Sequence, residues 1–190
     1  MFDVLLRNGT VIDGTGRRRF QADVGIEGGR ITLVGPANGA EAHETLDVRG
    51  KIVCPGIVDV HSHADLSIFR EGHERLLEPL VRQGITTFVG GNCGIALAPI
   101  EPEKRRAVET YLSVFTRLDM KRDVQWKRMG EFFDLVESRG LVMNGAVLAP
   151  HGLLRLNACG MEMRPASGAE VEHMAGSLEA ALDAGAIGMS

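Results

Sequence analysis

The sequence predicts an α/β protein in which a small all-β region precedes a longer region of alternating strands and helices. Residues 1–54 hold short apolar segments separated by turn residues and show no helical period. From Pro55 onward, β-branched runs alternate with segments whose apolar residues recur every three or four positions. Such alternation is typical of a parallel sheet with helical crossovers. A doubly wound sheet and a (β/α)8 barrel both fit this pattern.

The composition is that of a globular protein and excludes several other classes. The chain has 190 residues, of which 44% are hydrophobic and 24% are charged. Its 21 Lys and Arg residues against 25 Asp and Glu give a net charge of −4, so we expect no nucleic-acid partner. We find no secretion signal and no apolar run of roughly 20 residues. We therefore expect no membrane association, and a cytoplasmic protein whose three cysteines are reduced.

The first 54 residues are expected to form a small antiparallel sheet. The Asn8-Gly9 pair is a tight-turn signal, and glycine-containing turns recur twice more. Three hairpins are expected, each joining two short apolar segments: 4–6 with 10–12, 23–26 with 31–34, and 45–48 with 52–54. So thin a sheet needs another surface to pack on.

The region after Pro55 is expected to contain four parallel strands connected by helices. The strands are expected at 57–63, 85–89, 141–148 and 186–190. Helical periodicity or capping residues indicate helices at 74–83, 107–118, 129–138 and 167–183. A doubly wound sheet could be complete with four strands, whereas a (β/α)8 barrel could not.

A histidine pair, His61 and His63, stands at the end of the first expected parallel strand. In a strand, residues i and i+2 share a face, so the two imidazoles point the same way and suit a divalent metal such as zinc. Asp59 has the same parity and could orient one of these ligands. The alternative is that these are incidental polar residues at a strand end.

The second expected strand runs into Gly90-Gly91-Asn92-Cys93-Gly94. Parallel α/β folds place ligands at the carboxyl ends of their strands, where a thiolate is a good zinc ligand. A buried small residue or a nucleophile are the alternatives for Cys93, although no His/Asn arrangement can be identified for a nucleophile. For Cys54 and Cys159 we expect buried, inert side chains.

Further histidines are less informative. His151 follows the third expected strand and either contacts substrate or is a loop residue without a role. His43, His73 and His173 are expected to be solvated.

Two stretches of the sequence, 8–16 (NGTVIDGTG) and 55–63 (PGIVDVHSH), resemble the amidohydrolase superfamily. Adding 91–94 (GNCG) and 185–190 (GAIGMS) narrows the resemblance to the N-terminal portion of the N-acyl-D-amino-acid deacylase (D-aminoacylase) family. The resemblance covers essentially the whole chain. It implies hydrolysis of the amide bond of N-acyl-D-amino acids, the expected small-molecule partner, by a zinc-dependent (β/α)8 barrel.

The resemblance also implies a site and a domain organisation. Cys93 would ligate zinc, and His61 and His63 would line a second, weaker metal position. Residues 1–54 would form part of a small β-sandwich domain, and 55–190 about four strands of the barrel. Two further histidines and an aspartate of the family site are missing, and Asp65 is the only nearby candidate for the carboxylate that would transfer the proton to the leaving amine. Because a barrel needs about 250 residues, we expect a fragment or a truncated form.

Three alternatives remain open at this point. The chain could be a catalytically incomplete half-barrel that self-associates as a homo-oligomer. It could hydrolyse cyclic amides, as other members of the same superfamily do. A complete doubly wound domain that binds a small ligand at its strand ends is the third.

Overall fold

The computed structural model describes residues 1–190, which divide into two compact units, Met1–Gly56 and Ile57–Ser190. The first unit contains only strands, and the second is α/β, as the sequence predicts. None of the helices is long and apolar enough to span a membrane.

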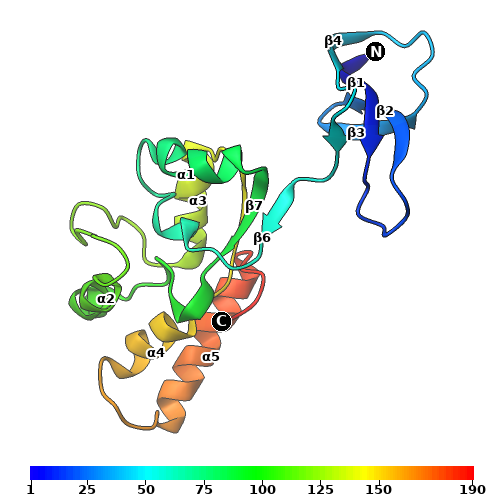
Figure 1. Ribbon diagram of the computed structural model, residues 1–190. Helices are drawn as coiled ribbons and strands as arrows, with labels where there is room; N and C mark the ends of the chain where they lie inside the picture. The colour runs from blue at the N-terminus through cyan, green and yellow to red at the C-terminus, as the bar shows by residue number, and fades with distance from the viewer. The chain divides into compact units, whose positions relative to one another are not determined.

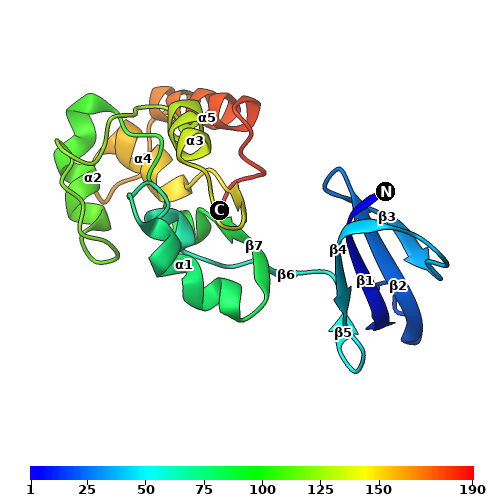
Figure 2. The same ribbon diagram turned by 90° about the horizontal axis from the view of Figure 1, so that it is seen from above.

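The first unit is a five-stranded sheet with the order β3-β2-β1-β4, in which β5 also pairs with β1 (Figure 2). Its strands are β1 (Phe2–Val11), β2 (Phe20–Glu27), β3 (Arg30–Gly35), β4 (Ala42–Asp47) and β5 (Ile52–Val53). The β2–β3 hairpin is confirmed, with Gly28 and Gly29 at positive φ in its turn. The side chains of Leu5, Val11 and Val24 are buried in this unit.

The hairpin predicted at Asn8-Gly9 is wrong, because β1 runs straight through these residues. Asn8 has φ 64°, but this conformation makes an irregularity in the β1–β2 pairing and not a chain reversal. The backbone N–H of Asn8 donates to Asp23 Oδ1 at 2.9 Å, and its side-chain amide donates to Asp47 Oδ1 at 3.0 Å. Side chains from the two neighbouring strands thus pair with the polar groups of Asn8, whose backbone departs from the regular β1–β2 hydrogen bonding.

The expected pairing of 45–48 with 52–54 is also wrong, and the sheet is mixed. Both β4 and β5 run parallel to β1, one after the other along the same strand. The segment that connects β4 to β5 is hydrogen-bonded to β1 at both of its ends. Val48 N–H donates to Arg7 O, and Thr10 N–H donates to Lys51 O. The turn at Gly50 therefore joins two strands that run in the same direction and does not form a hairpin.

The second unit contains a three-stranded parallel sheet with the order β6-β7-β8 and five α-helices. The strands are β6 (Ile57–Asp59), β7 (Ile85–Gly90) and β8 (Asn144–Val147). The helices are α1 (His73–Arg82), α2 (Arg105–Leu112), α3 (Met129–Arg139), α4 (His151–Cys159) and α5 (Gly168–Asp183). Short 3-10 turns are η1 (Ala64–Leu66), η2 (Asn92–Gly94) and η3 (Pro102–Lys104).

The fourth expected strand is present only as an isolated parallel bridge between Ala149 and Met189. Backbone hydrogen bonds flank it, from Ile187 N–H to Val147 O at 3.0 Å and from Ser190 N–H to Ala149 O at 3.1 Å. The last residues thus extend the sheet beyond β8 without forming a full strand. The sheet of this unit is open and no barrel is closed.

Two helices differ from expectation. Helix α2 ends at Leu112 and not at 118; the chain beyond it is held by Arg105, whose guanidinium donates to Met120 O and Val124 O. Helix α4 was not predicted, although Leu153 and Leu156 form a buried stripe on it.

Buried aromatic residues fill the core of the second unit. The ring of Trp126 lies 5.1 Å from that of Phe132 and 5.8 Å from that of Phe69. Its indole Nε1 donates to Leu97 O at 2.6 Å, which ties the segment after Cys93 to this core. Phe88 of β7 is fully buried in the same core. The carboxyl ends of the strands are therefore fixed by dense packing.

Candidate metal centre

The histidine pair lies just beyond the first parallel strand and not within it. Strand β6 ends at Asp59, where the carboxylate accepts the backbone N–H of His61 at 3.2 Å. The N–H of Ser62 then donates to Val89 O of the neighbouring strand at 3.0 Å. The expected strand to residue 63 is thus too long. The two imidazole rings still lie close together, edge to face, with centroids 5.9 Å apart.

Cys93 lies in η2, the tight turn that follows β7. Its φ is 58°, in the left-handed region that non-glycine residues seldom adopt. Gly91 before it has φ 76°, and a Cβ atom at this position would collide with the carbonyl oxygen of Leu148 on the adjacent segment. The turn therefore needs glycine at position 91, where the backbone passes close to Leu148, and the side chain of Cys93 is exposed.

Asn92 joins this turn to the histidine segment. Its side-chain amide donates to Val89 O at 2.8 Å and to Ser62 O at 3.4 Å. Ser62 stands between the two histidines, so one buried amide links both ligand-bearing segments.

These segments bring three donor atoms together. The Nε2 atom of His61 lies 3.2 Å from Cys93 Sγ, and one atom each of His61, His63 and Cys93 lie within 4.8 Å of one another. The structure thus brings together all three residues that the sequence singled out as metal ligands.

The donor set fits zinc. Zn–N and Zn–S bonds of about 2.0–2.1 and 2.3 Å place the two ligand atoms of a tetrahedral site roughly 3.6 Å apart. Small adjustments would therefore suffice for His61 and Cys93. The Nδ1 atom of His63 is buried without a hydrogen-bond partner, which is a costly arrangement in the absence of a ligand or proton acceptor.

Asp65 is the unusual carboxylate next to this cluster. Its side chain is fully buried, and neither carboxylate oxygen makes a hydrogen bond of normal geometry. Burial raises the pKa of Asp65 to about 7, although the nearby backbone N–H of Gly91 lowers it in part. It is not one of the clustered donors.

The remaining histidines and cysteines lie outside the cluster. His151 is the exposed first residue of α4, and its predicted contact with substrate stays a prediction. His43 and His173 are exposed as expected, whereas the expectation for His73 is wrong: it is buried, and its Nδ1 pairs with Arg70 O at 3.0 Å. Cys159 is buried as expected. Cys54 is exposed, contrary to expectation.

Sequence reasoning missed two neighbours of the cluster on α2 and the turn that follows it. The hydroxyl of Tyr111 lies 3.5 Å from Gly94 O; burial and then the charge of Cys93 raise the pKa of its phenol. The Phe115 ring stacks toward that of His63, with centroids 6.5 Å apart. Phe115 lies beyond the end of α2 at Leu112, so no helical spacing links it to Tyr111, and no local signal indicated either contact.

Comparison with known proteins gives a consistent set of relatives, although no family model matches the chain. The D-aminoacylase of Alcaligenes xylosoxydans xylosoxydans is 35% identical over 189 residues, covering 100% of this chain and 37% of the relative. The N-acyl-D-glutamate deacylase of Bordetella bronchiseptica, solved with zinc and a phosphonate inhibitor, is 35% identical with a TM-score of 0.83. That match covers 99% of this chain and 38% of the solved one.

A solved D-aminoacylase, described for its binuclear metal centre, is 33% identical with a TM-score of 0.83. The match covers 100% of this chain and 38% of the solved one. The chain thus spans little more than a third of the length of the proteins that it matches. Over its whole length the chain is similar to the N-terminal portion of D-aminoacylases and related N-acyl-D-amino-acid deacylases.

Proposed function

We propose that this chain supplies the first part of the active site of a zinc-dependent deacylase that hydrolyses the amide bond of N-acyl-D-amino acids. The observation that carries the proposal is the convergence of His61, His63 and Cys93 at the carboxyl ends of β6 and β7. This is the edge of a parallel α/β sheet at which active sites are built. The names of the relatives support the substrate class.

Each residue has a distinct task in this proposal. Cys93 supplies a thiolate, the one anionic ligand of the three, while His61 and His63 supply neutral imidazoles. Zinc bound there would lower the pKa of a coordinated water from about 15.7 to about 7 and polarise the scissile carbonyl. The carboxylate of Asp59 fixes the backbone of His61 and so orients the first ligand.

No carboxylate is among the three clustered donors. The Asp59 carboxylate accepts the backbone N–H of His61, and the Asp65 carboxyl group is enclosed next to the histidine segment without a hydrogen-bond partner. Proton transfer to the leaving amine therefore needs a group beyond the residues described. We propose that turnover requires the longer chain of the relatives, of which these 190 residues cover 37%.

Zinc titration of the 190-residue chain tests the proposal. We expect Cys93→Ser to weaken zinc binding more than His61→Ala or His63→Ala, because it removes the only negative charge of the set. Cys54→Ser is the matched control, since Cys54 is an exposed cysteine outside the cluster.

The same samples are assayed with N-acetyl-D-amino acids and with a cyclic amide. We expect no turnover above a zinc-only control for the chain alone. Zinc affinity of Cys93→Ser equal to that of the unmodified chain would refute the metal site. Turnover that disappears in Cys93→Ser would refute the need for a longer chain, and turnover of the cyclic amide alone would favour that substrate class.

A further inference from the structure

The turn that carries Cys93 is held by side-chain hydroxyl groups from two distant parts of the chain. Both backbone polar groups of Gly94, the residue after the cysteine, contact such hydroxyl groups. Its N–H donates to Ser190 Oγ at 3.1 Å, and its carbonyl lies 3.5 Å from the hydroxyl of Tyr111. The Ser190 hydroxyl in turn donates to the carbonyl of Gly91, on the other side of Cys93.

These contacts close the turn on both sides. Ser190 bridges Gly91 and Gly94, so one hydroxyl fixes the two residues that flank the Asn92-Cys93 pair. Ser190 itself is fixed by its backbone, because its N–H donates to Ala149 O and its carbonyl accepts the N–H of His151 at 2.8 Å. Figure 1 shows the last residues beside the carboxyl end of β7.

Tyr111 reaches the same turn from the helix layer. It projects from α2 toward a narrow gap, where a Cβ atom on Gly152 would collide with both its hydroxyl and Gly94 O. The absence of a side chain at Gly152 therefore lets the phenol approach the turn. The Tyr111 side chain is partly buried at this position.

The conformation of Cys93 explains why such support is needed. A cysteine at φ 58° is strained by about 1–2 kcal/mol relative to ordinary backbone. Such strain persists only where the surroundings over-determine it. Relaxation of the turn would move the thiol away from His61, whose Nε2 now lies 3.2 Å from it.

We propose that Ser190 and Tyr111 are positioning residues of the metal centre, which hold the Cys93 turn in its ligating geometry. The proposal rests on the proposed metal site and deepens it. It couples the thiolate ligand to the end of the sheet through Ser190 and to α2 through Tyr111.

The test uses the full 190-residue chain in a Cys54→Ser background, in which the only other cysteine besides Cys93 is the buried Cys159. Co²⁺ is the probe, because its visible spectrum and its thiolate charge-transfer band report coordination that zinc does not show. The variants are Ser190→Ala, Ser190→Thr and Tyr111→Phe. Ser138→Ala is the control, since Ser138 also bonds a backbone carbonyl, that of Leu135, but lies on α3.

We expect Ser190→Ala and Tyr111→Phe each to weaken Co²⁺ binding by roughly tenfold, the usual effect of losing a partner that orients a ligand. Ser190→Thr keeps the hydroxyl and should restore affinity, and Ser138→Ala should leave it unchanged. Affinities of Ser190→Ala and Tyr111→Phe within twofold of the background would overturn the proposal. So would an equal loss in Ser138→Ala.

A second readout separates this inference from the proposed function. In the metal-free chain, the rate and pH profile with which Cys93 reacts with a disulfide reagent report its position beside His61. We expect both to change in Ser190→Ala and to return in Ser190→Thr. If the background binds no Co²⁺, the proposed function fails, and an unchanged thiol reaction in Ser190→Ala and Tyr111→Phe then overturns the inference as well.

Discussion

Asp65 illustrates at the scale of one residue how a site is placed at a cost to stability. Its carboxyl group is removed from water without a hydrogen bond of normal geometry, next to the histidine segment. A Cβ atom on Gly90 would collide with it, so β7 has no side chain at the point where the carboxyl group packs. Burial favours the neutral form, which is why its pKa rises to about 7.

The sign of the resulting pH dependence follows from proton binding. Between the ordinary pKa of 3.8 and about 7, the folded chain retains a proton that the unfolded chain has released. The free energy of unfolding should therefore fall as the pH rises from 4 to 7, by at most on the order of 4 kcal/mol at about 1.4 kcal/mol per pKa unit. We expect Asp65→Asn to abolish this fall and to be more stable than the unmodified chain at pH 8.

Urea unfolding followed by the fluorescence of Trp126 measures this, because Trp126 is the only tryptophan and reports the second unit. Asp134→Asn is the control, an exposed aspartate on α3 that should keep the pH dependence. A free energy of unfolding that is flat between pH 4 and 7 in the unmodified chain would contradict the expectation.

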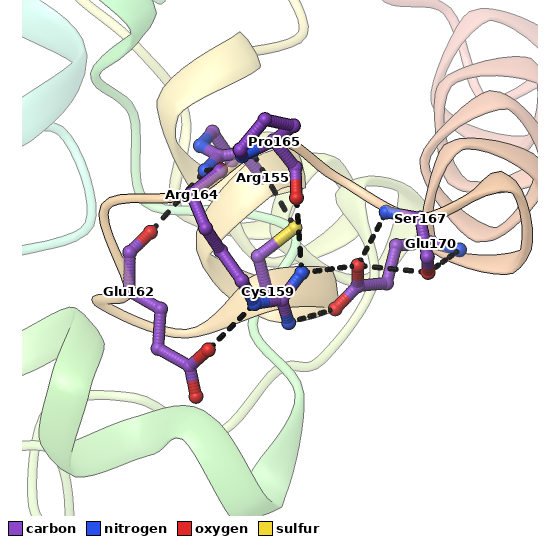
Figure 3. Close-up of polar contacts among 7 residues, drawn as sticks. All are labelled: Arg155, Cys159, Glu162, Arg164, Pro165, Ser167 and Glu170. Atoms are coloured by element: carbon purple, nitrogen blue, oxygen red, sulfur yellow. Dashed lines mark hydrogen bonds and ion pairs between the residues drawn. The ribbon is translucent and has the colours of Figure 1, made fainter.

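At the scale of elements, the start of α5 is the feature most completely encoded by neighbouring residues (Figure 3). Ser167 Oγ accepts the N–H of Glu170, and the Glu170 carboxylate accepts the N–H of Ser167 at 2.7 Å. Arg164 adds two contacts to the same carboxylate, at 2.8 and 2.6 Å, which lower the pKa of Glu170. Arg155 of α4 in turn donates to Arg164 O and Glu162 O, so the connection between the helices is held at both ends.

We expect Ser167→Ala to lower the free energy of unfolding of the second unit by about 1 kcal/mol, the usual cost of losing a helix N-cap. Ser177→Ala, within the same helix, should be neutral or slightly stabilising, because alanine has the higher helix propensity. Trp126 fluorescence in urea again measures both. A loss in Ser177→Ala as large as that in Ser167→Ala would show that the cap contributes nothing specific.

The same element shows which parts of the structure the sequence could predict. The capping box predicts α5 because all of its partners lie within a few residues. The proximity of the histidine pair to Cys93 is predictable because the carboxyl ends of neighbouring parallel strands meet at one edge of the sheet. The Asn8-Gly9 hairpin was wrong because the partners of Asn8, Asp23 and Asp47, lie on other strands. Ser190 contacts Gly91 across 99 positions, a pairing that no local pattern reveals.

At the scale of the whole molecule, the open sheet of the second unit leaves strand edges unpaired, and these edges decide how the chain is expected to associate with copies of itself. Strand β6 pairs only with β7, and Ile57, Val58 and Val60 on and after it are 54%, 52% and 70% exposed. Beyond β8, Ile187 and Met189 are also more than half exposed. Unpaired strand edges with apolar side chains are templates for further pairing.

We therefore expect the 190-residue chain to self-associate in a concentration-dependent way, as measured by light scattering. Val60→Lys should shift it toward the monomer, because a charge at the edge opposes pairing. Val114→Lys adds the same charge at a valine that is 81% exposed outside the sheet, and should have little effect. A monodisperse monomer at all concentrations, or equal effects of the two variants, would contradict this expectation.

The position of β1 at the start of the chain also affects when its sheet can be completed during synthesis. This strand begins at residue 2, yet one of its sides is completed only by β4 and β5, whose residues lie between 42 and 53. During synthesis at roughly 5–20 residues per second, that side of β1 stays open for several seconds after the strand has been made. The sheet of the first unit is therefore completed only after residue 53 has been made, and slow translation of these codons would prolong the interval in which nascent chains can pair with one another.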